Sequence, residues 1–122
     1  MAKKVFLVDD ADFIVDMLRV IVEGAGYKVV GSAFNGPKAL EAIEKLPEDS
    51  VPDIVTVDFH MPQMDGLETI NRIRALLPGV RILLISAHAT LPIVMKAKET
   101  GVDAFIAKPF EPKTLLELLE KW

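Results

Sequence analysis

Acidic residues, a serine and a lysine stand at the ends of short apolar runs in this 122-residue chain. Asp9 and Asp10 follow the first run, Asp58 the third, Ser86 the fourth and Lys108 the fifth. Three carboxylates held close together raise one another's pKa unless positive charge compensates them. One lysine offsets part of that repulsion, and a hard divalent cation such as Mg²⁺, which prefers oxygen ligands and retains several waters, would offset the rest.

A Mg²⁺ site with an open face, an ammonium and a hydroxyl is suited to holding a phosphoryl group. Each residue taken alone has an ordinary explanation. An acidic pair such as Asp9–Asp10 is usually a helix cap, Ser86 could cap the helix after it, and a lone Lys108 is most often solvated. Their common position at the ends of apolar runs favours a site.

The apolar runs have the composition of buried strands. They are short, rich in β-branched or aromatic residues, and mostly apolar throughout, which is typical of strands covered on both faces. The five predicted strands are Val5–Val8, Tyr27–Val30, Ile54–Val57, Ile82–Ile85 and Ala104–Ala107.

Longer amphipathic segments separate these strands, and prolines near their starts and glycines near their ends mark the boundaries. The predicted helices are residues 12–25, 37–46, 66–77, 91–100 and 112–121. Strands separated by helices pair in parallel through right-handed crossovers, and the helices then cover both faces of one open sheet. The sequence therefore predicts an α/β, doubly wound (βα)₅ fold. Sites in such folds form beyond the carboxyl ends of the strands, where the first and third strands should bring the three carboxylates together.

Composition narrows the functional class further. Apolar residues make up 51% of the chain, the net charge is −4 and there is no cysteine. These values predict a single domain over residues 1–122 in the cytoplasm. The acidic balance argues against a nucleic-acid partner, and no apolar stretch is long enough for a membrane span.

Four motifs resemble those of response-regulator receiver domains. They are VDDA after the first strand, PDIVTVDFHMPQMDG around the third, ISA at the fourth and GVDAFIAKPF at the fifth. The similarity covers the whole chain and, in AGYKVVGSAFNG, is greatest to the single-domain chemotaxis type. This resemblance implies a flavodoxin-like five-stranded parallel sheet in the order 2-1-3-4-5, and a phosphoacceptor role in two-component signal transduction.

The resemblance also implies a role for each acidic residue. Asp58 is the expected phosphoacceptor, which takes the phosphoryl group from a phosphohistidine of a histidine kinase. Asp10 and Asp58 are expected to bind Mg²⁺ through their carboxylates, Asp9 through a water, and His60 through its backbone carbonyl.

The remaining site residues are implied in the same way. Lys108 is expected to contact the bound phosphoryl group, and Ser86 to donate its hydroxyl to it. Phe105 matches the aromatic residue that turns inward when that hydroxyl moves. The resulting switch would alter the surface of the fourth helix, fifth strand and fifth helix, where a downstream target protein binds.

Backbone features are implied too. The Lys108–Pro109 peptide bond is expected to be cis, an isomer found almost entirely before proline. Pro62 and Gly66 are expected to shape the loop behind Asp58.

Other functions stay open on the residues alone. A Mg²⁺-dependent phosphohydrolase also uses an Asp nucleophile, although such enzymes usually place a second Asp where this chain has His60. A structural receiver module cut from a longer regulator, or one that dimerises, is another; we expect a monomer. His60 and His88 both border the expected pocket. One hypothesis is that their titration tunes phosphoryl lifetime, and the alternative is that they are unrelated loop residues.

Overall fold

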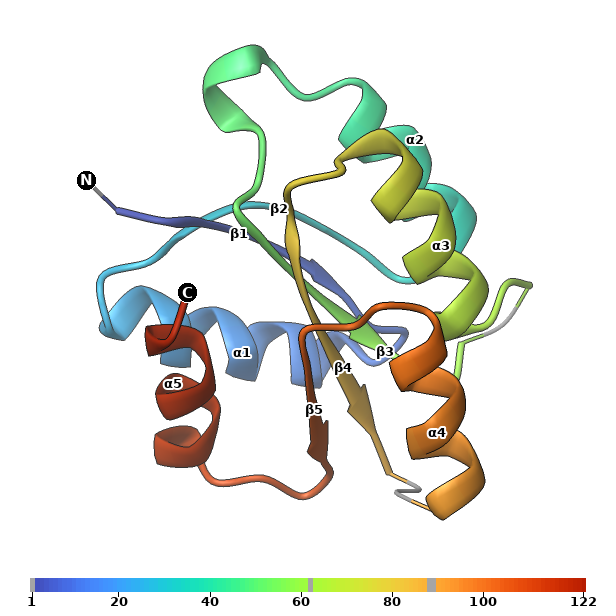
Figure 1. The fold of residues 1–122 in the computed structure, drawn as a ribbon. Helices are drawn as coiled ribbons and strands as arrows, with labels where there is room; N and C mark the ends of the chain where they lie inside the picture. Colours follow the sequence, from blue (N-terminus) through green and yellow to red (C-terminus); the bar gives the residue numbers. More distant parts are fainter. Residues whose placement is uncertain (1, 62, 88–89) are drawn as a thin grey trace.

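The computed structural model describes all residues except Met1, Pro62, His88 and Ala89. Five strands form one parallel sheet in the order β2-β1-β3-β4-β5, which confirms the predicted topology (Figure 1). The strands are β1 (Lys4–Val8), β2 (Lys28–Ala33), β3 (Ile54–Asp58), β4 (Arg81–Ser86) and β5 (Ala104–Ala107).

Helices alternate with the strands along the chain, as the sequence predicts. They are α1 (Asp12–Gly24), α2 (Gly36–Glu44), α3 (Gly66–Leu76), α4 (Leu91–Glu99) and α5 (Pro112–Glu120), with a short 3₁₀ turn, η1 (Glu48–Ser50), before β3. The amide of Lys38 donates to the Asn35 side chain at the start of α2, and the amide of Glu68 donates to Asp65 at the start of α3. These caps satisfy amides that have no partner inside the helix.

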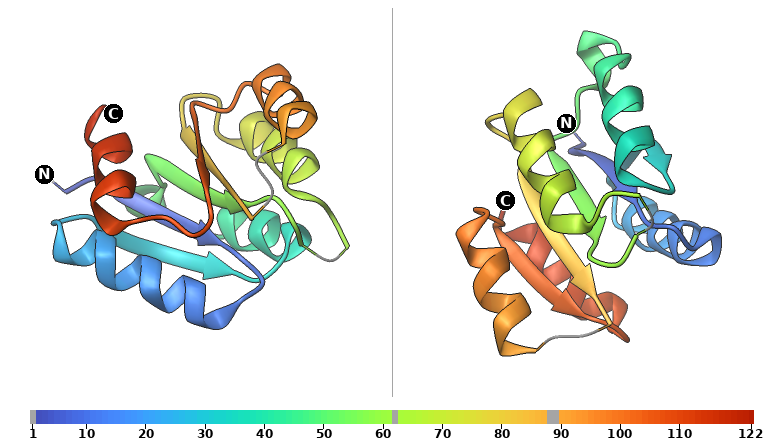
Figure 2. Two further views of the ribbon diagram at one scale, coloured as in Figure 1. Left: turned by 90° about the horizontal axis from the view of Figure 1, so that it is seen from below. Right: turned by 90° about the vertical axis from the view of Figure 1, so that its right-hand side faces the viewer.

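The helices form two layers, one on each face of the sheet, as the views in Figure 2 show. Leu18 of α1 and Leu115 of α5 share one buried cluster with Val5 and Leu7 of β1. Helices α2, α3 and α4 cover the other face.

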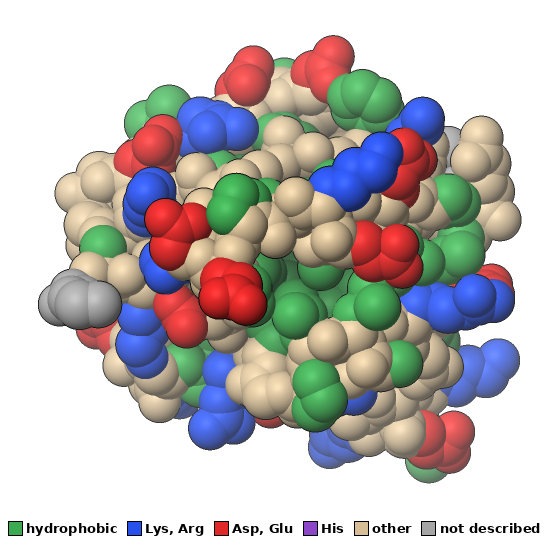
Figure 3. Space-filling model, turned by 90° about the horizontal axis from the view of Figure 1, so that it is seen from above, with side chains coloured by type: hydrophobic (Ala, Val, Ile, Leu, Met, Phe, Trp, Pro, Cys, Tyr) green, Lys and Arg blue, Asp and Glu red, His purple; other side chains and the backbone are tan. Residues whose placement is uncertain are grey.

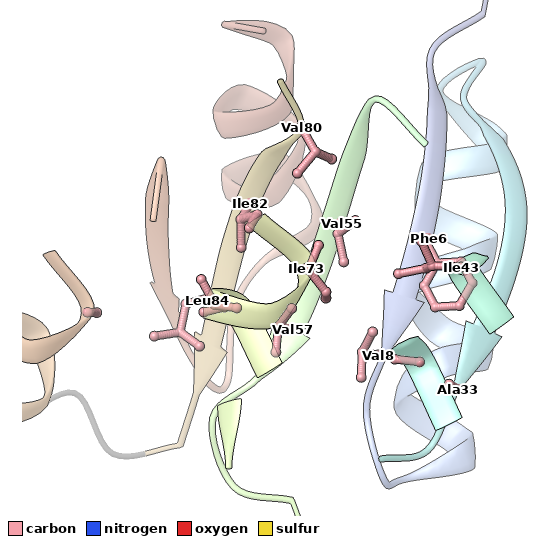
Figure 4. Packing of buried hydrophobic residues seen from close by; sticks show 13 residues of the cluster. Phe6, Val8, Ala33, Ile43, Val55, Val57, Ile73, Val80, Ile82 and Leu84 are labelled. Carbon is pink, nitrogen blue, oxygen red and sulfur yellow. The ribbon is translucent and has the colours of Figure 1, made fainter. Parts of the chain in front are cut away.

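A second buried cluster lies between these helices and the sheet. It contains the alternate residues of the strands, because successive side chains of a strand point to opposite faces. Phe6 and Val8, for example, pack there with Val55 and Val57 of β3 and with Ile73 of α3 (Figure 4). The three central strands β1, β3 and β4 are therefore buried on both sides, which explains why their runs are apolar throughout.

Strand β2 is longer than the sequence predicts, because it continues through Gly31 and Ser32 to Ala33. A Cβ atom at Gly31 would lie 2.7 Å from the Phe6 ring, so glycine leaves room for that ring. The β1–β2 register also shifts between Val5 and Phe6. The glycine that interrupts the apolar pattern is thus a packing requirement of the strand.

Chain reversals at the carboxyl ends of the strands form the edge that carries the predicted site; we call it the carboxyl edge, and its opposite the amino edge. There the Lys108–Pro109 peptide bond is cis, as predicted. Within the part of the chain that the structure describes, no helix is both long and apolar enough to traverse a membrane.

Candidate functional site at the carboxyl edge

Strand pairing brings the predicted residues to one place. Asp58 is the last residue of β3 and pairs with Ile85 of β4, while Val8, the residue before Asp9, pairs with Val57. Asp9 and Asp58 therefore leave two neighbouring strands at the same level of the sheet. The amide of Lys108 donates to the Ser86 carbonyl at 2.7 Å, which extends the β4–β5 ladder to the same edge.

The three carboxylates form one cluster. Ligand oxygens of Asp9, Asp10 and Asp58 all lie within 4.8 Å of one another. Asp9 and Asp58 are buried, whereas Asp10 is exposed. The cluster thus has a buried floor and an open side.

Lys108 supplies positive charge directly to this cluster. Its Nζ donates to Asp9 Oδ2 at 3.1 Å and to Asp58 Oδ1 at 3.2 Å. Burial alone would lower the pKa of Lys108, but the hydrogen bond and charge of Asp9, together with Asp58, outweigh burial and raise it. Lys108 therefore stays protonated and is shared between two carboxylates.

The pKa of Asp58 differs from that of an ordinary aspartate. Burial, followed by the negative charge of Asp9, raises the pKa of Asp58 from 3.8 to about 6, although Lys108 acts in the opposite direction. Asp9, in contrast, also accepts the Ala11 amide at 2.9 Å through Oδ1. Burial and the charge of Asp9 thus make ionisation of Asp58 costly, because Lys108 compensates them only in part.

This donor set fits a divalent cation. All the side-chain ligands are hard oxygens, their charge exceeds that of the single lysine, and one side of the cluster is open to solvent, features that suit Mg²⁺ with retained waters. An added cation would relieve the repulsion that raises the pKa of Asp58.

A glycine holds the loop close behind Asp58. The Gly66 amide donates to the Phe59 carbonyl at 3.0 Å. A Cβ atom at Gly66 would lie 2.6 Å from the Asp58 backbone oxygen. The first turn of α3 can approach the end of β3 because this position has no side chain. Pro62, expected to shape the same loop, lies outside the described residues.

The other predicted site residues that the structure describes differ in burial. Ser86 is the last residue of β4 and is fully buried. Phe105 on β5 is half-buried and packs against the cluster under α2, α3 and α4. His60 is exposed, with its ring edge-on to Phe59 at a centroid distance of 4.7 Å. His88 lies outside the described residues, so the hypothesis that pairs it with His60 stays a prediction.

A groove of about 680 Å³ lies far from these residues, at the amino edge. Figure 3 shows a hollow with hydrophobic side chains on that face. Leu76, Val80 and Trp122 are among the residues that line it, and Asp53 is its one carboxylate in the described chain. The groove therefore lacks the charge cluster that phosphoryl chemistry requires.

Comparison with known proteins agrees with this geometry. Residues 5–120 match the response regulator receiver domain family. The chain belongs to this family. Receiver domains are the phosphoaccepting switch modules of two-component systems, and this one is of the CheY-like kind.

Individual relatives match over nearly their full lengths. The chemotaxis protein CheY of Thermotoga maritima is 41% identical, over 99% of this chain and 98% of that protein. Sporulation initiation phosphotransferase F of Bacillus subtilis is 30% identical, over 100% and 94%. A solved complex of CheX and CheY with BeF3 and Mg²⁺ from Borrelia burgdorferi contains a chain with a TM-score of 0.90 and 28% identity, over 98% of this chain and 87% of that one.

Proposed function

We propose that this receiver domain accepts a phosphoryl group on Asp58 from the phosphohistidine of a histidine kinase, in a chemotaxis-like pathway. One observation carries the proposal: Asp58 is buried, lies beside Asp9 and Asp10, and shares the single ammonium of Lys108. A carboxylate whose charge is poorly compensated is prepared to interact with a cation and with an electrophilic phosphorus atom.

The transfer requires only one covalent step from the protein. An Asp58 oxygen forms a bond to phosphorus as the bond from phosphorus to the histidine nitrogen breaks, and the imidazole leaves with the electron pair of that bond. Such transfers depend on positioning and on charge stabilisation, with little further covalent participation by the protein. Lys108, already 3.2 Å from Asp58, would exchange its carboxylate contact for the phosphoryl oxygens.

Asp10 and Asp58 would hold Mg²⁺ directly, with Asp9 acting through a water and His60 through its carbonyl. When bound, the ion supplies positive charge that neutralises the carboxylates and the incoming phosphoryl oxygens. The exposed position of Asp10 leaves the open side of the cluster free for the donor.

Ser86 and Phe105 would transmit the change. Ser86 lies at the end of β4, next to the β5 strand that carries Phe105. Its hydroxyl would turn towards the phosphoryl group, Phe105 would move inward, and the surface of α4, β5 and α5 would change for a target protein. The chain would act as a monomeric cytoplasmic switch, with no reaction beyond gaining and slowly losing its own phosphoryl group.

Mass spectrometry after incubation with acetyl phosphate tests this proposal. The parent should gain one phosphoryl group in Mg²⁺ and none when Mg²⁺ is chelated. Asp58→Asn should gain none in either condition. Asp49→Asn, which changes an exposed aspartate of η1, is the matched control and should behave like the parent.

Uptake by Asp58→Asn equal to that of the parent would show that another residue accepts the group. Uptake by the parent that is independent of Mg²⁺ would contradict the assigned role of the carboxylate cluster.

A further inference from the structure

Helix α4 is attached to the rest of the protein unevenly. Of its residues only Ala97, in the last turns, is buried. Leu91 and Met95, nearer its start, are 71% and 56% exposed. Ile93 and Val94, which lie between them, are half-buried. This half of the helix therefore gains less packing energy than a fully buried apolar face would.

Arg74 lies in the last turn of α3 and contacts the segment that follows α4. Its guanidinium donates to the Gly101 carbonyl at 2.8 Å and to Asp103 Oδ2 at 3.1 Å, and also to the Val80 carbonyl. One planar group thus joins the end of α3, the start of β4 and the α4–β5 turn. Arginine can do this because its fork presents several fixed donors.

Asp103 completes the connection to β4. Its Oδ2 accepts the Ile82 amide at 2.8 Å, while its own amide donates to the Ile82 carbonyl at 3.0 Å. Arg81 adds a contact to Oδ1 at 3.3 Å. Burial alone would raise the pKa of Asp103, but the Ile82 amide and Arg74 outweigh burial and lower it. The turn after α4 is therefore held by several hydrogen bonds to an ionised carboxylate.

Among the described residues, the opposite end of α4 has few such restraints. The Thr90 side chain makes no capping hydrogen bond, and the first turn contains no acidic residue to interact with the helix dipole. This end lies beside the carboxyl end of β4, where Ser86 is located (Figure 1). Helix α4 has nine residues, so its two ends lie about 12 Å apart.

We propose that Arg74 and Asp103 form a fixed pivot, so that phosphorylation moves mainly the Leu91–Met95 half of α4. Arg74 is a positioning residue: it fixes one end of the helix and thereby converts a small displacement near Ser86 into a rotation of the exposed apolar face. The pivot itself follows from the contacts above, whereas its use in switching depends on the proposed function.

Hydrogen exchange on the unphosphorylated protein tests the pivot. Arg74→Met keeps the apolar stem and removes the guanidinium. Amides of residues 96–103 should then exchange about tenfold faster, after correction for global stability measured in urea. Arg72→Met is the matched control, because Arg72 lies on the same helix and pairs only with exposed Glu68 in the described chain. It should leave these amides unchanged.

The phosphorylated protein tests the coupling. In the parent and Arg72→Met, phosphorylation by acetyl phosphate should change exchange at residues 91–95 much more than at 96–103. In Arg74→Met that contrast should shrink roughly threefold or more, because the helix no longer has a fixed end. If Arg74→Met does not fold, Arg74→Lys, which keeps the charge without the fork, takes its place.

Unchanged exchange at residues 96–103 in the unphosphorylated variant would overturn the pivot. A contrast equal to that of the parent in the phosphorylated variant would overturn the coupling. If the parent takes up no phosphoryl group, the proposed function fails, and the unphosphorylated comparison still decides whether the pivot exists.

Discussion

The two edges of the sheet both carry clustered charge, but they balance it differently. At the amino edge one carboxylate, Asp103, lies between the guanidiniums of Arg74 and Arg81. At the carboxyl edge three carboxylates lie close together, and the ammonium of Lys108 contacts two of them, Asp9 and Asp58. The pKa of Asp103 is lowered, whereas that of Asp58 is raised to about 6.

This difference separates a cluster that holds the fold together from one that is prepared for a reaction. Compensated charge stabilises the folded protein, because the native state favours the ionised form. Uncompensated charge costs stability and is retained where a ligand or reactant will relieve it. The comparison predicts opposite effects when a carboxylate is removed from each edge.

The largest effect is expected at the amino edge. Asp103→Ala should lower the free energy of unfolding by about 2–4 kcal/mol, because it leaves the Ile82 amide without its acceptor and removes the carboxylate that pairs with Arg74 and Arg81. Urea denaturation measures this directly. Asp16→Asn, an exposed change on α1, is the control; an Asp103→Ala loss no larger than the control's would show that the amino-edge cluster is not stabilising.

At the carboxyl edge, removal of a carboxylate should raise the free energy of unfolding instead of lowering it. Asp58→Asn should raise the free energy of unfolding at pH 7 by roughly 1–3 kcal/mol without Mg²⁺, because the folded parent must ionise a group whose pKa is raised. The unfolded chain releases this proton near pH 3.8 and the folded protein near pH 6. The contribution of Asp58 to stability is therefore present at low pH and is lost as pH rises between these values.

Denaturation in urea across pH 4 to 7 tests the sign. The free energy of unfolding of the parent should fall relative to that of Asp58→Asn as pH rises, and the difference should level off above pH 6. A variant less stable than the parent at pH 7 would contradict the repulsion argument.

The smallest effect concerns a polar residue between the two edges. Thr56 is fully buried in the middle of β3, and its hydroxyl has no hydrogen-bond partner among the described residues. Thr56→Val should stabilise the protein by about 1 kcal/mol, because the methyl group that replaces the hydroxyl needs no partner.

Thr69 offers the matched control. It is equally buried, but its hydroxyl donates to the Asp65 carbonyl at 2.8 Å. Thr69→Val should therefore destabilise the protein under the same thermal or urea unfolding. If Thr56→Val and Thr69→Val changed the stability equally, hydrogen bonding of the hydroxyl would not be what determines the effect of these substitutions.

Much of the carboxyl edge could be predicted from the sequence, because parallel strands place residues at their ends on one edge. Asp9, Asp58 and Lys108 needed only correct strand ends to be brought together. Asp58 and Ser86 turned out to be the last residues of their strands, a difference of one position.

The amino edge could not be predicted in the same way. Arg74 lies in a helical pattern where a cation normally suggests a solvated face, and Asp103 is 29 residues away. Their contact depends on how α3 and the α4–β5 turn pack, which periodicity does not reveal. Gly31 likewise interrupts the apolar pattern of β2, and the sequence does not show why. Only the folded protein shows that the Phe6 ring lies beside this position.

The charge imbalance at the carboxyl edge can be measured directly by ¹³C NMR titration of the Asp58 carboxyl carbon, with and without Mg²⁺. Without Mg²⁺ the pKa should lie near 6. Saturating Mg²⁺ should move it well below that value, because the cation compensates the charge of the ionised form. An ordinary aspartate pKa without Mg²⁺, or no response to the ion, would contradict the account.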